Sequence, residues 1–238
     1  GDEAGTAITT GDGNVAIGYQ ALDAEDAHGL NTAIGYQALS AQDAGFDAKN
    51  TAVGYQAGGA VTEGDRNTLV GTTAGSSLTH ADFNVALGEA ALAADTLGSR
   101  STAVGRAALN AQNFTTATDT YNTAVGNNAG LSVTTGTFNT LIGGLAGDAT
   151  DDGVGNTAVG YSALGANAAN YNVAIGHECL LACTGTNNTC IGVVAGSNVT
   201  SGSNNISIGR DAGLTGSPGG NVTTGGNNIL LGDENIDY

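Results

Sequence analysis

Basic residues are scarce in this chain of 238 residues. Five lysines and arginines stand against 22 aspartates and glutamates, which gives a formal net charge of -17 at pH 7. A protein that binds nucleic acid neutralises phosphates with a basic face, so this deficit argues against a nucleic-acid partner. The surplus of carboxylates favours solubility and opposes side-to-side clumping.

Long apolar runs and prolines are also lacking. No stretch approaches the roughly 18 apolar residues of a membrane-spanning helix, so the sequence predicts no membrane insertion. The start at Gly1 shows neither the basic nor the apolar part of a signal peptide, although a leader removed earlier would leave the same start. Proline occurs once, at Pro218, and the 40 glycines do not recur at every third position, which excludes a collagen triple helix.

The glycines belong to a short repeat, which is clearest in Asn31–Leu39, read as Asn-Thr-Ala-Ile-Gly-Tyr-Gln-Ala-Leu. Thirteen copies follow one another at a spacing of about 17 residues, and three of them carry insertions. This regularity indicates one repeat domain over residues 14–238, preceded by a lead-in at 1–13. The copies begin at Asn14, Asn31, Asn50, Asn67, Asn84, Ser101, Asn122, Asn139, Asn156, Asn172, Asn188, Asn205 and Asn228.

Counted from this asparagine, position two is β-branched and position four is branched aliphatic, while position three is mostly alanine and position five is glycine. Such alternation is typical of a strand. We therefore expect an all-β fold, a parallel β-roll or β-helix solenoid of about thirteen rungs, with two short strands per rung; a three-sided prism is an alternative cross-section. The asparagines are expected to form a hydrogen-bonded ladder between rungs.

The bulky face is expected to fill the interior, and the smooth face of positions three and five is expected to lie at a homotrimer axis. The expected core residues are those at position four: Ile17, Ile34, Val53, Val70, Leu87, Val104, Val125, Ile142, Val159, Ile175, Ile191, Ile208 and Leu231.

Residues with catalytic chemistry do not converge in the sequence. The histidines His28, His80 and His177 fall in separate repeats, without a recurring serine or cysteine partner. No nucleophile elbow, His-Glu-x-x-His motif or phosphate loop occurs. We therefore expect no enzyme, no catalytic residue and no cofactor.

Two groups of residues have the chemistry of metal ligands. The turn with Asp148, Asp151 and Asp152 is a weak calcium candidate, although it lacks the spacing of an EF-hand, and solvated turn carboxylates are the alternative. Cys179, Cys183 and Cys190 lie in two adjacent repeats. They fit small apolar filler, and a metal site with His177 or a disulfide is the other interpretation.

Receptor contacts are expected on aromatic residues and on the inserted loops. Tyr19, Tyr36 and Tyr55 occupy the same position of three consecutive repeats, each followed by glutamine, and could stack on sugars or form a structural ladder. Insertions in solenoids emerge as loops, commonly on the binding side, although they can also be tolerated surface excursions. The insertions are Ser40–Lys49, Asn110–Tyr121, with Asn113 and Phe114 as proposed contacts, and Leu214–Asn227.

The repeat Asn-Thr-Ala-Ile/Val-Gly-Tyr-Gln-Ala-Leu resembles the repeats of bacteriophage tail fibres and related fibrous proteins. Its Asn-x-Ala-Ile-Gly core is also similar to the head repeats of trimeric autotransporter adhesins, whose rungs are usually shorter. The resemblance implies a left-handed parallel β-roll in a homotrimer. The ending Asn227–Tyr238 is similar to the segment that precedes a self-cleaving chaperone in phage fibres, which implies a processed product or a fragment.

This resemblance implies a structural and receptor-binding segment of a phage tail fibre, located on a virion tail or otherwise outside the cell. Its partners would be its own copies, a host cell-surface glycan or protein, and other virion tail proteins. A bacterial adhesin head and a subunit of an extracellular filament are the alternatives, the latter because the end rungs offer open strand edges.

Overall fold

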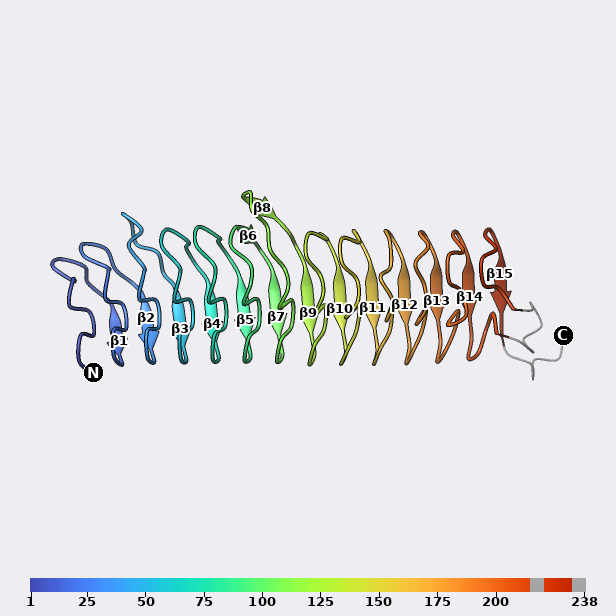
Figure 1. Cartoon of the computed structure of the whole chain (residues 1–238), viewed down its shortest axis with the longest axis horizontal. Coiled ribbons are helices and arrows are strands. Elements are labelled where there is room, and N and C mark those ends of the chain that lie inside the picture. The colour runs from blue at the N-terminus through green and yellow to red at the C-terminus, as the bar shows by residue number, and fades with distance from the viewer. Residues whose placement is uncertain (215–220, 233–238) are drawn as a thin grey trace. The chain divides into compact units, whose positions relative to one another are not determined.

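The computed structural model describes residues 1–214 and 221–232, and this part of the chain forms an all-β parallel solenoid without a helix (Figure 1). No described segment is a helix that could cross a membrane. The chain divides into two compact units, Gly1–Asn122 and Thr123–Tyr238.

Each repeat contributes one three-residue strand, which directly follows its asparagine or serine. In the first unit the strands pair in the order of the chain, and they are β1 (Val15–Ile17), β2 (Thr32–Ile34), β3 (Thr51–Val53), β4 (Thr68–Val70), β5 (Val85–Leu87) and β7 (Thr102–Val104). In the second unit they are β9 (Thr123–Val125), β10 (Thr140–Ile142), β11 (Thr157–Val159), β12 (Val173–Ile175), β13 (Thr189–Ile191), β14 (Ile206–Ile208) and β15 (Ile229–Leu231).

Equivalent positions of successive repeats face one another in the sheet. Thr51 pairs with Thr68, for example, and Val53 with Val70. A second, two-stranded parallel pair joins β6 (Gly98–Ser99) to β8 (Thr118–Asp119), which lies in an insertion that rises beyond the neighbouring turns in Figure 1. The expected spacing and parallel stacking are thus confirmed.

The expectation of two strands per rung is wrong for most of the described rungs, because the chain turns directly after the strand, and only the rungs of β5 and β7 add a second strand, β6 and β8. Gln37 and Leu39 adopt positive φ angles of 53° and 48°, which no strand can contain. The glycine at position five begins this turn. At Gly71, with φ of 134°, an added Cβ would lie 2.5 Å from the carbonyl oxygen of Gly88, so that only glycine fits.

Inside each rung, the turn folds back over position three. Ala33 in the strand and Ala38 and Leu39 in the turn are fully buried, and the same holds for their equivalents Ala103, Ala108 and Leu109. The interior of a rung is narrow. Wherever leucine occupies position nine, position three is therefore alanine. Small residues therefore form the core, together with leucines supplied by the turn.

Position four lies on the outer face, so its assignment to the core is wrong for the chain by itself. Ile17 is 56% exposed and Ile142 is 40% exposed. Leu141, at position three of the same strand as Ile142, is completely buried. The alternation in the sequence correctly predicts the two faces of the strand, but the turn determines which face is inside, and the turn closes over the small residues. The residues concerned are Ile17, Ile34, Val53, Val70, Leu87, Val104, Val125, Ile142, Val159, Ile175, Ile191, Ile208 and Leu231, each half-buried or exposed.

The buried asparagines form a ladder along each unit. The Oδ1 atom of Asn31 accepts the backbone N–H of Asn50 at 3.0 Å, and Oδ1 of Asn50 accepts that of Asn67 at 2.8 Å. In most rungs the amide of the asparagine also donates to a backbone carbonyl thirteen or fourteen residues later, as Asn67 Nδ2 does to Ala81 at 2.8 Å. These bonds satisfy buried backbone groups in the turns, which accounts for the recurrence of asparagine.

Candidate interaction surfaces

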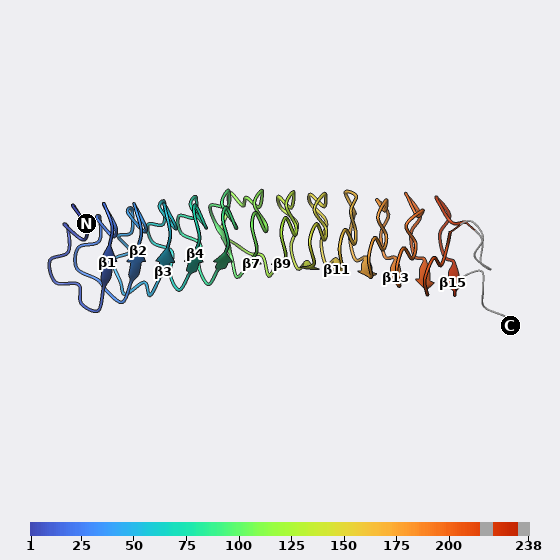
Figure 2. The ribbon, with the colours of Figure 1, turned by 90° about the horizontal axis from the view of Figure 1, so that it is seen from below.

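The first surface is the outer face of the parallel strands, which Figure 2 shows side by side along one side of the ribbon within each unit. Its side chains come from positions two and four, and not one of them is charged. Position two supplies Val15, Thr32, Thr51, Thr68, Val85, Thr102, Thr123, Thr140, Thr157, Val173, Thr189, Ile206 and Ile229. We call this set, with the aliphatic residues of position four, the outer sheet face.

The tyrosines at position six form a stacked ladder in the first unit. The ring centroids of Tyr19 and Tyr36 lie 5.3 Å apart, and those of Tyr36 and Tyr55 lie 5.2 Å apart. Their neighbouring glutamines form an amide ladder, in which Gln37 Nε2 donates to Gln20 Oε1 at 2.9 Å. Because each ring covers its neighbour, the ladder offers mainly ring edges and hydroxyls to a ligand.

A polar groove of about 430 Å³ runs beside the amide ladder. Its lining is short or amide-bearing, and consists of Gln37, Ser40, Gln56, Gly59, Ala60 and Ser76. The amides and hydroxyls of this lining offer hydrogen-bond donors and acceptors of the kind that a sugar hydroxyl would meet.

A second aromatic surface was missed in the sequence, at the residue that precedes each asparagine. We call Lys49, Arg66, Phe83, Arg100 and Tyr121 the edge column. The guanidinium of Arg100 lies 4.7 Å from the ring centroid of Phe83 and 5.9 Å from that of Tyr121, and Arg66 lies 5.3 Å from Phe83.

The edge column holds three of the five basic residues of the chain. Arg66 also pairs with Asp65 at 2.5 Å, and Arg100 with Asp119 at 2.9 Å. The signal in the sequence for this column is the recurrence of cationic and aromatic residues directly before the asparagine or serine of successive repeats. All five residues have positive φ angles.

The insertion Asn110–Tyr121 is anchored by the residue proposed for receptor contact. Phe114 is 7% exposed, and its backbone N–H donates to Asp95 Oδ1 at 3.0 Å, so its side chain is not available to a receptor in this conformation. Asn113 is exposed, as are Thr115, Thr116 and Ala117 at the tip.

The other insertions offer one further exposed aromatic side chain. Phe46, in the insertion Ser40–Lys49, is 44% exposed. Part of the insertion Leu214–Asn227 lies outside the described residues.

The expected calcium ligands do not converge. The carbonyl of Asp148 accepts the N–H of Ser132 at 3.0 Å, and that of Asp151 accepts the N–H of Thr134 at 2.8 Å, so these residues serve the stacking of rungs. Burial raises the pKa of Asp148. Asp152 is exposed, and no ligand cluster forms there among the described residues.

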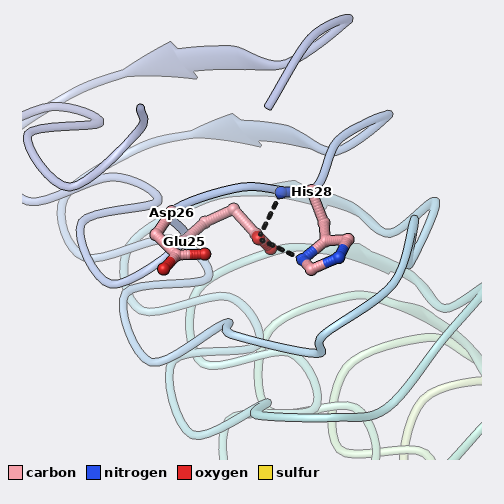
Figure 3. Close-up of side chains that lie close together, drawn as sticks. All are labelled: Glu25, Asp26 and His28. Atoms are coloured by element: carbon pink, nitrogen blue, oxygen red, sulfur yellow. Dashed lines mark hydrogen bonds and ion pairs between the residues drawn. The ribbon is translucent and has the colours of Figure 1, made fainter. Parts of the chain in front are cut away.

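One cluster of ligand-type side chains is found in the described part of the chain, formed by Glu25, Asp26 and His28 (Figure 3). Their donor atoms lie within 4.8 Å of one another. Glu25 is fully buried, and this burial raises the pKa of its carboxyl, against the opposing effect of the hydrogen bond from the His28 backbone.

The three cysteines are free thiols inside the core. Cys190 fills position three and Cys179 fills position eight, both places that alanine usually takes, and all three are buried. Burial raises the pKa of Cys183 to about 11, and the hydrogen bond with Cys190 together with burial raises that of Cys179. His177 lies outside, with half of its side chain exposed, so the geometry agrees with apolar filler.

Comparisons with protein-family models, with curated proteins and with solved structures return no match to this chain.

Proposed function

We propose that the chain is a structural and receptor-binding segment of a bacteriophage tail fibre, in which three copies associate into a rigid, left-handed β-solenoid trimer. The observation that carries this proposal is the outer sheet face. It is uncharged in every rung, although the chain as a whole contains 27 charged residues (22 acidic and five basic).

The outer sheet face has the composition of a surface that another protein covers. Its aliphatic side chains recur at about 4.8 Å, the spacing between paired strands. Soluble monomers rarely expose contiguous apolar patches larger than a few hundred Å², and larger patches commonly mark contacts between proteins. A second and third copy present the same face, so that closed symmetry can bury it in all copies.

This proposal moves the trimer contact away from position three. Ala103 and Ala124, which were expected at the axis, are fully buried within their own rungs. Glutamate at either position would therefore disrupt the fold itself, and such variants would not report on association.

Host attachment is assigned to the polar and aromatic surfaces that the outer sheet face leaves free. The edge column, the exposed loop residues and the groove beside Gln37 and Gln56 offer cations, aromatic edges and amides to a cell-surface glycan or protein. Threefold repetition would add weak contacts through avidity. Other tail proteins would be the partners along the virion tail.

The mass of the particle tests the assembly. The double variant Ile142→Glu with Ile175→Glu places two charges on the outer sheet face. The control Tyr161→Glu places one charge in the repeat between these two, at a side chain outside the outer sheet face that is 51% exposed. Light scattering is expected to give three chains for the parent and for Tyr161→Glu, and one chain for the double variant with its β-sheet circular dichroism retained. A monomeric parent, or a double variant that stays trimeric, contradicts the proposal.

Two other functions share the same fold. A bacterial adhesin head is distinguished by the genes that flank the coding sequence. A self-polymerising filament is distinguished by electron microscopy of the purified chain, which would then show particles of many lengths. Adsorption to host cells tests attachment directly: Arg66→Ala with Arg100→Ala is expected to weaken it, with Tyr161→Ala as the control.

A further inference from the structure

The turn of residues 25–28 in the first rung brings three metal-ligand side chains together. Glu25 enters the interior, while Asp26 and His28 lie on either side at the surface (Figure 3). Nδ1 of His28 lies 3.9 Å from Oε1 of Glu25. Two atoms that each bind one ion at about 2.1 Å are at most about 4.2 Å apart, so a single ion can bridge this pair.

The carboxylate of Glu25 has poorer partners than the equivalent buried carboxylate of Asp95. Asp95 accepts hydrogen bonds from the backbone N–H of Gly98 at 3.1 Å and of Phe114 at 3.0 Å, and from Gln112 Nε2 at 2.6 Å. Among the described residues, Glu25 accepts hydrogen bonds only from the His28 N–H at 3.2 Å and from Asn31 Nδ2 at 3.4 Å. A fully buried carboxylate with two long hydrogen bonds is left incompletely compensated.

The imidazole of His28 supplies a second unsatisfied atom. Its Nδ1 is buried and has no hydrogen-bond partner. At 3.9 Å, Oε1 of Glu25 is too distant for a hydrogen bond but faces it directly. A ring nitrogen that is shielded from water and has no hydrogen-bond partner is free to bind a metal ion through its lone pair.

The backbone around the cluster is held in place from the preceding segment. The carbonyl of Asp26 accepts the N–H of Thr9 at 2.7 Å, and the carbonyl of His28 accepts Asn14 Nδ2 at 3.0 Å. The carboxylate of Asp43, from the next rung, adds negative potential at Glu25. The ligands are therefore positioned before an ion arrives, in surroundings that attract a cation.

We propose that Glu25, Asp26 and His28 form a binding site for one divalent transition-metal ion of the zinc type. One imidazole nitrogen and two carboxylates suit zinc, whereas calcium takes six to eight oxygen ligands. Water would complete the coordination shell. The ion would stiffen the turn of residues 25–28, to which Thr9 of the lead-in is hydrogen-bonded. This role does not depend on what the assembled particle binds.

The test is titration of the metal-free chain with zinc chloride by calorimetry, with calcium and magnesium chloride as comparisons. One equivalent of zinc per chain is expected to bind, and calcium and magnesium are expected to bind at least tenfold more weakly. Glu25→Gln and His28→Ala are each expected to raise the zinc Kd at least tenfold. Both should fold, because Gln42 and Gln112 occupy the place of Glu25 in other rungs and Ala81 occupies that of His28.

His80→Ala is the matched control, because Nε2 of His80 lies 3.8 Å from Oε1 of Glu63 but that pair is exposed and has no third ligand. It should bind zinc like the parent. Long-range nitrogen-15 spectra should also show zinc shifting Nδ1 of His28 in the parent. Absence of saturable zinc binding, or unchanged binding in His28→Ala, overturns the proposal, and the latter would point to the buried cysteines instead.

Discussion

Leu69 and Gly75 share one space in the core: a Cβ added to Gly75 would lie 2.7 Å from Cδ2 of Leu69. Gly147 stands in the same relation to Leu141, at 2.6 Å. Where the turn supplies a leucine at position nine, as at Leu39, position three is alanine, and only Ala52 and Ala124 combine alanine with a glycine at position nine. The strand and the turn therefore divide one fixed volume between them, as close-packed interiors require.

Moving the large side chain from position three to position nine within one rung should preserve stability. Leu69→Ala alone leaves a cavity and is expected to cost about 2 to 5 kcal/mol of unfolding free energy. Adding Gly75→Leu should recover a large part of this loss, because Leu39 and Leu92 already adopt the same positive φ at that place. Thermal and denaturant melts measure both variants. A double variant no more stable than Leu69→Ala would show that the two positions do not share volume.

Removing one member of the asparagine ladder should be costly. Oδ1 of Asn156 accepts the N–H of Asn172 at 2.9 Å, and its Nδ2 donates to the carbonyl of Ala169 at 2.8 Å. Asn156→Ala leaves both groups without that partner in a buried place, at about 1 to 3 kcal/mol for each. Urea melts should show the loss, and Asn127→Ala is the control, because Asn127 is exposed and is not among the residues with a positive φ angle. A change below about 0.5 kcal/mol would mean that water replaces the side chain.

The base of the insertion Asn110–Tyr121 should be structural and its tip dispensable. Gln112 joins Asp95, Ser101 and Asn122 through hydrogen bonds of 2.6, 2.9 and 2.9 Å. Gln112→Ala is expected to cost several times the roughly 1 kcal/mol of a single hydrogen bond.

Deletion of the exposed residues 115–117 should leave the melting temperature within a few degrees of the parent. Shortening the whole insertion to the standard spacing, expected from the sequence to be harmless, would remove Gln112 and Phe114 and is now expected to damage the fold. Melting temperatures of the two deletions distinguish these outcomes. Equal melting temperatures would contradict the anchoring role of the base.

Stability should depend on pH through Asp82. Burial raises the pKa of its carboxyl, the charge of Asp65 raises it further, and the N–H of Asp65 and the charge of Arg100 oppose this rise. The folded state therefore holds this proton more tightly than the unfolded chain does, so the ionised group costs stability as pH rises through the folded pKa.

Asp82→Asn should accordingly raise the melting temperature at pH 7, and its advantage should disappear below the ordinary pKa of an aspartate, about 3.9. Melts from acidic to neutral pH measure the difference from the parent. Asp12→Asn, at an exposed carboxylate, controls for net charge. An advantage that is independent of pH would assign the effect to packing.

The rungs, their spacing and the ladder could be predicted from the sequence because each depends on local repetition. The orientation of the sheet could not, because alternation at Leu141 and Ile142 defines two faces without defining which is inside. That choice is made by the turn, through positive φ angles at residues such as Gln37 and Leu39, which are neither glycine nor asparagine and carry no turn signal.

The candidate surfaces divide in the same way. The stacking of Tyr19 on Tyr36 follows from their shared place in the repeat, and so does the position of the edge column once rungs are aligned. The burial of Phe114 and the approach of Glu25 to His28 depend on how particular turns fold. Such contacts arise between residues whose spacing does not recur, so the repeat pattern of the sequence does not predict them.

The matching of each strand with its equivalent in the next rung bears on how this molecule can change its length. Excision of residues 51–67 would join Asn50 to Thr68, and Thr32 would then face Thr68 as it now faces Thr51. Every new neighbour would be of a kind already present in the sheet. Tandem duplication or loss of a coding segment one repeat long could therefore lengthen or shorten the protein during evolution without disrupting the core.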